Sequence, residues 1–404
     1  FKNRAEEALG HTIEVVSGRE EARLVYSGVA HSSPQRGEKL LVVDIGGGST
    51  ELIAGEGFTP SELFSLQMGC VSITRRFFPD GRMTAKRVKK ARIAARVELE
   101  PIVASLRALS WDEAIGASGT IRAAAEVMTA QGGGRANKEL TPEGLTDLIR
   151  RMVDAGEIRK LSMPGLDPER APVFPGGMIV LESIFKELGI DSMRVSDGAL
   201  REGILFDLVG RITHEDARER SIRSLQQRYN IDLVQAQHVE ETAVTLLRSL
   251  ADQWDLTLND QELLLRWAAR CHELGLAIAH SGFHRHGAYL LENSDLPGFS
   301  TFEQARLATL VALHRKRFRE EELERIRPDR RAAIRKLAII LRIAVVLHRG
   351  RSPELTPRAA VKAAGRKLKL NFGDDWLAAH PLTRADLERE ARYLGEADLK
   401  LEVV

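Results

Sequence analysis

Residues 40–55 read LLVVDIGGGSTELIAG, and this stretch organises the first half of the chain. An apolar run ends in Asp44, the glycines Gly46–Gly48 follow, and Ser49 precedes a second apolar run that begins after Glu51. This pattern predicts two strands joined by a tight turn. Glycines let successive N–H groups point into one concavity, which attracts anions, and hydroxyl groups add donors. Because an acid at a strand end can hold Mg²⁺ directly or through water, we expect a hairpin that grips phosphate.

The composition is that of an ordinary globular chain with two to four domains. Of the 404 residues, 43% are hydrophobic and 29% are charged, and the formal net charge is +2. The two cysteines, Cys70 and Cys271, lie far apart and form no metal-binding or redox spacing, which is typical of a reducing compartment. No signal peptide is expected, and the sequence contains no uncharged apolar run of about 18 residues. We therefore expect a cytoplasmic protein without a spanning helix.

A helix with a defined start is predicted over residues 17–31. Ser17, followed three residues later by Glu20, forms the pattern of a capping box, in which the Glu20 side chain turns back toward the helix start. Glu21, one position further, takes no part in the cap. A carboxylate near a helix N-terminus has a lowered pKa. We therefore expect Glu21 to orient or deprotonate water rather than to act as a general acid.

A second turn of glycines and hydroxyls, AIGASGT, spans Ala114–Thr120 and leads into a helix predicted over Ile121–Met128. Free N–H groups at a helix start favour anions, so this turn is a second candidate phosphate contact. The alternative is a plain strand-to-helix connection. A similar turn at residues 196–203, SDGALREG, opens a further helix that reaches about Val209. Strands alternate with helices through this half, which predicts a mixed sheet covered by helices.

The other predicted elements of the first half follow from apolar periodicity and from the positions of glycine and proline. Helices are expected over Phe1–Gly10, Thr84–Ala108, Thr141–Lys160 and Gly176–Leu188, strands over His11–Val16, Leu63–Met68 and Ser192–Val195, and irregular chain over Gly132–Leu140 and Pro164–Pro175.

The second half has a different pattern. From His214 to about Arg349 the sequence predicts helices, and the apolar residues of Arg331–Leu347 predict a helix in the core. Alternating segments at Lys367–Phe372 and Asp398–Val404 then predict two strands on either side of a helix, so we expect a small α+β tail.

Six histidines in the helical part resemble the layout of HD phosphohydrolases, in which His, a His–Asp pair and a later Asp hold metals: His238, His272, His280, His284, His286 and His314. Here the pair is His272–Glu273, and the extra methylene of Glu displaces the carboxylate. We expect a structural relic, with a working metal site or a phosphate-contacting role as the alternatives. The arginine-rich segments at 315–319 and 325–335 fit an anionic polymer, or form a solvated surface.

Five motifs together resemble the exopolyphosphatase / guanosine pentaphosphate phosphatase family, and they occur in the family's order: DIGGGSTEL, MGCVS, GASGT, FPGG and SDGALREG. The helical part is similar to that of the long bacterial exopolyphosphatases. The resemblance implies an α/β lobe of the actin and sugar-kinase (ribonuclease H-like) type, an all-α HD-like domain and a small α+β C-terminal domain. It implies the following segments: 1–22 as a remnant of a first actin-like lobe, 23–211 as the second lobe, 212–345 as the helical domain and 346–404 as the C-terminal domain.

Members of this family begin with a strand and a first phosphate turn of the type Asp-x-Gly-Ser-Asn-Ser. No such segment occurs in this sequence. The family's active site lies between two lobes, so we expect this chain to be an inactive fragment that carries half of the phosphate clamp.

The resemblance also implies roles for individual residues. Glu21, the second Glu of the EEAR sequence, corresponds to the catalytic glutamate. Asp44 would position the metal, with Glu51 beside it or one layer further out. The residues that would hold phosphate belong to two turns: Gly46, Gly47, Gly48 and Ser49 in the first, and Gly116, Ser118, Gly119 and Thr120 in the second.

For the full protein, the resemblance implies an exopolyphosphatase that releases orthophosphate processively from the end of inorganic polyphosphate with Mg²⁺, and K⁺ as an optional activator. The three-glycine turn and the SDGALREG motif favour this activity. The alternatives are a guanosine pentaphosphate phosphatase, with guanosine penta- or tetraphosphate as its partner, and a non-catalytic regulator that binds polyphosphate or nucleotide. A sugar kinase is disfavoured because the sequence shows no recognisable site for a phosphoryl acceptor. A homodimer is implied, no nucleic acid partner is expected, and peripheral association with the inner membrane is an alternative location.

Overall fold

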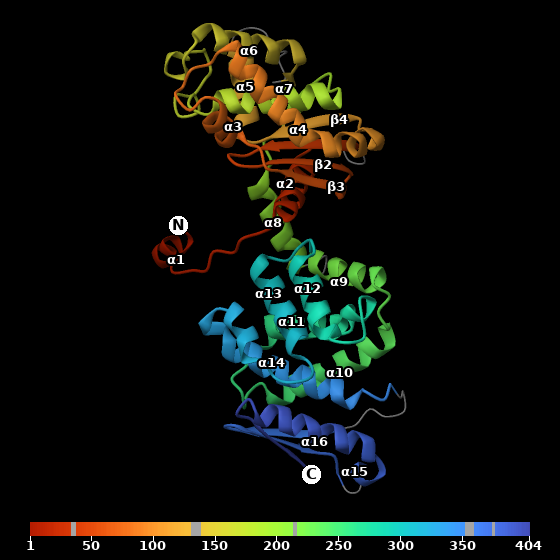
Figure 1. The fold of residues 1–404 in the computed structure, drawn as a ribbon. Coiled ribbons are helices and arrows are strands. Elements are labelled where there is room, and N and C mark those ends of the chain that lie inside the picture. Colours follow the sequence, from red (N-terminus) through yellow and green to blue (C-terminus); the bar gives the residue numbers. More distant parts are fainter. Residues whose placement is uncertain (34–37, 131–138, 213–215, 352–358, 374–375) are drawn as a thin grey trace. The chain divides into compact units, whose positions relative to one another are not determined.

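The computed structural model describes residues 1–33, 38–130, 139–212, 216–351, 359–373 and 376–404 (Figure 1). Contacts divide the chain into two compact units. The sheet unit contains Ser17–Asp216, and the helical unit contains Phe1–Val16 together with Ala217–Val404. One boundary thus lies close to the predicted boundary at 211/212, whereas the first 16 residues group with the helical unit and not with the segment that follows them. The predicted four-part division stays a prediction.

The sheet unit is built on a six-stranded mixed sheet with the strand order β3-β2-β1-β4-β6-β5. The strands are β1 (Lys39–Ile45), β2 (Thr50–Glu56), β3 (Thr59–Leu66), β4 (Glu113–Ala117), β5 (Glu139–Leu140) and β6 (Met193–Val195). Strands β1 and β2 form an antiparallel hairpin, and β4 pairs in parallel with both β1 and β6. The predicted hairpin and the predicted mixed sheet are therefore confirmed.

Helices cover both faces of this sheet because its strands are apolar on both sides (Figure 1). Leu41 and Val43 of β1 pack into a core with the helices α3 (Cys70–Phe77), α4 (Ala85–Leu109), α5 (Gly119–Ala130), α6 (Pro142–Ala155) and α7 (Phe174–Leu188). Leu40 and Val42, which point to the opposite face, pack with the helices α2 (Gly18–Ser32) and α8 (Leu200–Ile212). A mixed sheet between helix layers fits the predicted actin-like lobe.

Helices α2 and α8 touch through their backbones. A Cβ on Gly28 of α2 would lie 2.0 Å from the carbonyl oxygen of Ala199, and a Cβ on Gly203 of α8 would lie 1.8 Å from the carbonyl oxygen of Leu24. Only glycine permits so close an approach. The close contact fixes α2, which carries Glu21, against α8.

The helical unit contains the helices α1 (Lys2–Leu9), α9 (Ala217–Arg228), α10 (Leu233–Leu250), α11 (Leu258–Cys271), α12 (Phe283–Asn293), α13 (Thr301–Leu313), α14 (Pro328–Leu347), α15 (Trp376–Ala379) and α16 (Pro381–Gly395). A three-stranded sheet follows the order β7-β8-β9, with β7 at Ala360–Ala364, β8 at Lys367–Asn371 and β9 at Lys400–Val403. One hydrophobic core runs from Ile222 to Leu401, so the helices and the small sheet share their interior.

Helix α14 lies in this core, as its apolar sequence predicts. Its Arg342 is fully buried and pairs with Glu390 of α16, and it also donates hydrogen bonds to the carbonyl oxygens of Leu313 and Lys316. A buried guanidinium with all of these partners avoids the cost of an unpaired charge.

Three local predictions are wrong. Residues 11–16 form no strand; instead the carbonyl of Val15 accepts a hydrogen bond from the Thr301 amide at 3.0 Å. The helix expected to reach Lys160 ends at Ala155, because Gly156 adopts a left-handed conformation (φ 71°) that closes it. Of the loop expected at 132–140, the end at Glu139–Leu140 is strand β5, and the rest lies outside the described residues.

Candidate active site

The two predicted phosphate turns lie next to each other at one edge of the sheet. Because β1 and β4 are parallel, with Asp44 paired to Ala117, the turns that follow them emerge side by side. The Thr120 hydroxyl donates to the carbonyl of Ile45 at 3.1 Å, and the Ile45 amide lies 3.4 Å from the Ser118 hydroxyl oxygen. The structure therefore brings together the two groups of residues that the sequence predicts to hold phosphate.

Backbone amides of helix α3 hold the hairpin turn by donating hydrogen bonds to the carbonyl oxygens of the turn. The Cys70 amide donates to the Gly46 carbonyl, and the Val71 amide to the Gly47 carbonyl, both at 2.9 Å. Within the described ranges, neither the Gly47 nor the Gly48 amide donates to another backbone group. The turn thus presents free N–H donors on the side away from α3, as binding of an anion requires.

An arginine that the sequence did not reveal as a site residue, Arg170, lies against the second turn. A Cβ on Gly119 would lie 2.3 Å from Nη2 of Arg170, so the guanidinium rests on the glycine at the start of α5. In the part of the chain that the structure describes, Arg170 forms no ion pair. Ser118 next to it adopts φ 117°, a backbone conformation that is rare for residues other than glycine. The arginine sits in a segment predicted to be irregular, and only the three-dimensional contact reveals its position.

Glu21 is available for chemistry because its neighbour is engaged in structure. The Ser17 hydroxyl accepts a hydrogen bond from the Glu20 amide at 3.2 Å, as predicted. The Glu20 carboxylate does not complete the predicted capping box. It is buried and receives two hydrogen bonds from Arg23 at 2.8 Å, and Arg23 also pairs with Asp207 of α8.

Three carboxyl groups, those of Glu21, Asp44 and Glu51, come close enough to repel one another. Burial raises the pKa of Asp44 to about 7, with Glu51 and Glu21 adding to the effect and Arg122 opposing it. Burial also raises the pKa of Glu51, and the hydrogen bond from Ser65 at 2.8 Å partly opposes that shift. The cluster is therefore a site of concentrated negative charge.

The predicted lowering of the Glu21 pKa is wrong. Burial raises the pKa of this carboxyl. A raised pKa makes Glu21 a stronger base, which agrees better with proton abstraction from water than the predicted shift did.

Asp44→Asn is expected to stabilise the sheet unit more at pH 8 than at pH 5. The pKa of Asp44 is about 7 in the folded protein against an ordinary value of 3.8, so folding binds a proton and stability falls as pH rises through this range. The neutral amide of Asn does not lose stability in this way. The gain in the free energy of unfolding should therefore be larger at pH 8 than at pH 5 by about 2 kcal/mol. Urea unfolding of both proteins in metal-free buffer measures it; an equal gain at both pH values would contradict the shift.

The donor set at this cluster fits a magnesium ion. Mg²⁺ prefers oxygen ligands and is commonly bound by one or two carboxylates, several waters and substrate phosphates. Among the described residues no group of three or more His, Cys, Asp or Glu side chains is arranged to hold a metal alone. Asp44 and Glu51 therefore fit an ion that takes its remaining ligands from water and phosphate.

Among the described residues of the helical unit, the histidines do not form such a donor group either. His272 and His314 are buried with ring centroids 5.6 Å apart, and in each the Nδ1 atom lies 2.6 Å from the carbonyl oxygen three residues earlier. Burial lowers the pKa of both imidazoles. Neutral, backbone-bonded histidines agree with the expected structural relic, although HD ancestry itself stays a prediction.

Comparison with known proteins agrees with this geometry. Residues 1–212 match the Ppx/GppA phosphatase family, and residues 217–391 match domain III of Ppx/GppA phosphatases. The chain belongs to the Ppx/GppA phosphatase family. The predicted family is thereby confirmed, and so is the general prediction of a phosphoanhydride hydrolase.

Two relatives of this Ppx/GppA phosphatase carry the name guanosine-5'-triphosphate,3'-diphosphate pyrophosphatase. The protein from Vibrio cholerae serotype O1 is 40% identical over 97% of this chain and 78% of its own length. That from Aeromonas hydrophila is 40% identical over 96% and 78%. A solved Ppx/GppA enzyme from Aquifex aeolicus is 28% identical, with a TM-score of 0.43 over 50% of this chain and 68% of that one. The relatives' names agree better with the alternative activity than with the exopolyphosphatase expected from the three-glycine turn.

No helix in the described ranges combines the length and the apolar composition that crossing a membrane requires.

Proposed function

We propose that the full protein hydrolyses the terminal phosphoanhydride bond of guanosine 5'-triphosphate 3'-diphosphate. The observation that carries this proposal is the 40% identity, over nearly the whole chain, to relatives named for that activity. The paired phosphate turns and the acid cluster supply the chemistry. Exopolyphosphatase activity is the second candidate, and the DIGGGST and SDGALREG motifs favour it.

In this proposal the terminal phosphate lies against the free amides of the hairpin turn and the Ser49 hydroxyl, with the start of α5 beside it. Glu21 accepts a proton from the attacking water. Oxygen from that water forms a bond to the terminal phosphorus, and the bond to the bridging oxygen breaks. Phosphoanhydride hydrolysis depends mainly on positioning and charge stabilisation, which a rigid turn supplies.

We infer that Asp44, with Glu51 nearby, holds the magnesium ion. When bound, this ion would neutralise charge on the phosphate oxygens. It would also relieve the repulsion among the three carboxyl groups. Activation by K⁺, binding of polyphosphate, homodimer formation and membrane association stay predictions.

Phosphate release from guanosine pentaphosphate and from long-chain polyphosphate, measured in parallel on the full-length protein, tests the proposal. We expect the higher kcat/KM with guanosine pentaphosphate. A clear preference for polyphosphate would establish the second candidate instead, and binding of both without hydrolysis would identify a regulator. The same assay on the 404-residue chain tests the prediction that it is inactive by itself.

Arg170→Gln is expected to lower kcat/KM for guanosine pentaphosphate by about 10-fold or more, because a hydrogen bond to a charged group contributes about 1.5–3 kcal/mol. The same measurement with polyphosphate tests whether Arg170 also contributes to the preference between the two substrates. Arg107→Gln on α4 is the matched control, since Arg107 is exposed and precedes the start of β4, at the opposite end of that strand from the second turn. Equal losses for the two substrates would show that Arg170 does not contribute to selectivity.

A further inference from the structure

The SDGALREG segment, which the proposed mechanism does not use, lies at the same edge of the sheet as the two predicted phosphate turns. It follows β6, which pairs in parallel with β4, and the Ser196 amide donates to the carbonyl of Gly116 at 2.8 Å. Strands β1, β4 and β6 are neighbours in the sheet. Because neighbouring strands lie about 4.8 Å apart, the three segments form a row that begins at the hairpin turn and ends at SDGALREG.

Arg122 connects the second turn to this segment. It lies in the first turn of α5, where its amide donates to the carbonyl of Ser118 at 3.0 Å. Its Nη2 atom donates to the carbonyl oxygen of Asp197 at 2.9 Å. This hydrogen bond holds the guanidinium in place but does not neutralise it, because a carbonyl group carries no net charge.

The rest of the guanidinium lacks a partner. Among the residues that the structure describes, Arg122 forms no ion pair, and its Nε atom is buried without a hydrogen-bond acceptor. Nearly all buried polar groups in proteins have a partner, and an exception calls for an explanation such as a bound ion, a water molecule or a catalytic role. The side chain is half-buried, so a ligand can still reach the guanidinium.

The acidic groups nearby do not pair with Arg122. Burial raises the pKa of Asp44 to about 7, and Arg122 opposes this shift, so its charge acts on the carboxylate cluster. The Glu202 carboxylate is also within electrostatic range, but it accepts a hydrogen bond from the Ala199 amide at 2.8 Å. Arg122 is therefore a positioned, unpaired cation beside the candidate active site.

We propose that Arg122 binds the second phosphate of the substrate, the one that follows the terminal phosphate. This inference rests on the proposed function, in which the terminal phosphate occupies the hairpin turn. A chain of phosphates that starts there and follows the row of turns brings its second phosphate to the start of α5, where Arg122 lies. The guanidinium group suits this task, because its planar set of N–H donors matches the oxygens of a phosphate.

The second phosphate is the leaving group of the proposed reaction. When the bond from the terminal phosphorus to the bridging oxygen breaks, that oxygen keeps the electron pair, and negative charge develops on the second phosphate. Arg122 donates hydrogen bonds to this group without transferring a proton, and it stabilises the charge as the charge forms. Guanosine pentaphosphate and polyphosphate both contain such a phosphate, so the role is the same for either substrate.

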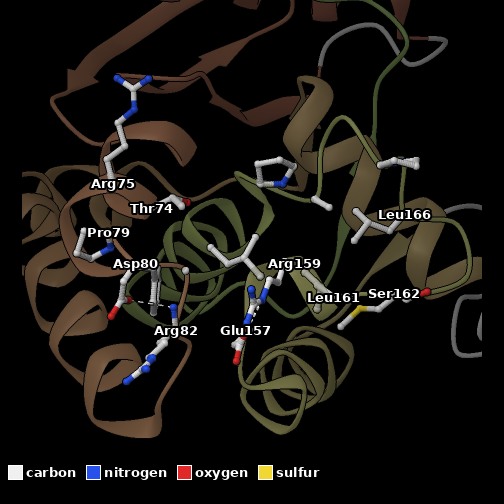
Figure 2. A pocket seen from close by; sticks show the side chains of 17 residues that line it. Thr74, Arg75, Pro79, Asp80, Arg82, Glu157, Arg159, Leu161, Ser162 and Leu166 are labelled. Carbon is white, nitrogen blue, oxygen red and sulfur yellow. Dashed lines mark hydrogen bonds and ion pairs between the residues drawn. The ribbon is translucent and has the colours of Figure 1, made fainter.

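Another part of the sheet unit supplies the contrast (Figure 2). A pocket of about 1030 Å³ lies between the end of α3 and the segment after α6. Its Arg75 and Arg82 point in opposite directions (Figure 2), and its carboxylates, those of Asp80 and Glu157, already pair with arginine side chains. These charges do not converge on one anion. Arg75, which also forms no ion pair among the described residues, is therefore the matched control for Arg122.

Calorimetric titration of the full-length protein with inorganic phosphate and with methylenediphosphonate, both with Mg²⁺ present, tests the binding step. The diphosphonate offers a second phosphate-like group and is not hydrolysed. We expect Arg122→Gln to weaken diphosphonate binding about 10-fold or more and to leave binding of inorganic phosphate within twofold, because hydrogen bonds between charged groups are the strong ones. Arg122→Lys should recover part of the affinity, and Arg75→Gln should bind both ligands as the wild type does.

Equal weakening of both ligands in Arg122→Gln, or unchanged binding of the diphosphonate, would overturn the proposal. The variant should fold, because the Arg122 side chain makes a single hydrogen bond to the described residues. If it does not fold, Arg122→Lys decides instead: it should lose at least threefold in affinity for the diphosphonate and nothing for inorganic phosphate, since a lysine cannot reproduce the planar set of donors.

The catalytic consequence is measured separately. In Arg122→Gln, kcat/KM for guanosine pentaphosphate and for polyphosphate should fall by about 10–100-fold, whereas Arg75→Gln should keep the wild-type values. Unchanged kcat/KM in Arg122→Gln would contradict a role at the leaving group. If the full-length protein hydrolyses neither substrate, the proposed function fails, and the titrations still decide whether Arg122 binds the second phosphate.

Discussion

Replacement of Glu21 by Gln is expected to lower kcat for phosphate release by a factor on the order of 10²–10⁴ in the full-length enzyme. The amide keeps the size of the side chain and cannot accept the proton of the attacking water. Because Glu20 and Ser17 maintain the start of α2, the fold should be unaffected. Single-turnover measurement of phosphate release separates the chemical step from substrate binding.

The matched control is Glu100→Gln on α4, an exposed glutamate without a role in the turns. It should retain the wild-type rate. If Glu21→Gln also retains it, Glu21 is not the base, and Asp44, with its pKa of about 7, becomes the next candidate.

Replacement of Gly28 by Ala should destabilise the sheet unit by about 3 kcal/mol, at the upper end of the usual cost of overpacking. The added carbon would lie 2.0 Å from the Ala199 carbonyl oxygen, and it would meet backbone, which cannot rotate away as a side chain can. For a unit of this size the loss corresponds to a fall in Tm of about 6–12 °C. Activity should fall as well, because α2 carries Glu21 and must shift relative to α8.

Gly395→Ala, in α16, provides the contrast, since a Cβ there meets no atom within 4 Å. Alanine has the higher helix propensity, so stability should stay the same or rise by up to about 1 kcal/mol. Ser27→Ala, next to Gly28 in α2, controls for any general sensitivity of that helix. If the Gly28→Ala protein has the same Tm as these two control variants, the crossing of α2 and α8 tolerates a larger separation of the helices.

Sequence was sufficient for the parts of the fold that depend on neighbouring residues. Apolar runs around three glycines predicted the hairpin, Ser17 predicted the start of α2, and the apolar pattern of 331–347 predicted a buried helix. The two turns were also predicted, because glycine and hydroxyl residues follow an apolar run in an unbroken segment in both; their binding of phosphate stays a prediction.

The remaining features depend on contacts between distant segments. Arg170 reaches the second turn only because the chain between α6 and α7 folds over α5. The raised pKa of Glu21 comes from burial, which the order of residues around a helix cap does not specify. Strand β5 exists because Glu139–Leu140 pairs with β6, more than 50 residues later. A three-glycine motif likewise cannot predict whether the substrate is guanosine pentaphosphate or polyphosphate.

The hydrogen bonds from α3 to the hairpin turn also determine which sign of charge the turn accepts. Helix α3 occupies the carbonyl oxygens of Gly46 and Gly47, so these lone pairs do not face an incoming ligand. The open side of the turn carries hydrogen atoms of N–H groups, which repel cations and attract anions whatever the side chains are. The backbone of the turn therefore favours anions, whereas the neighbouring carboxylate cluster favours cations. A phosphate bound together with a metal ion would satisfy both preferences.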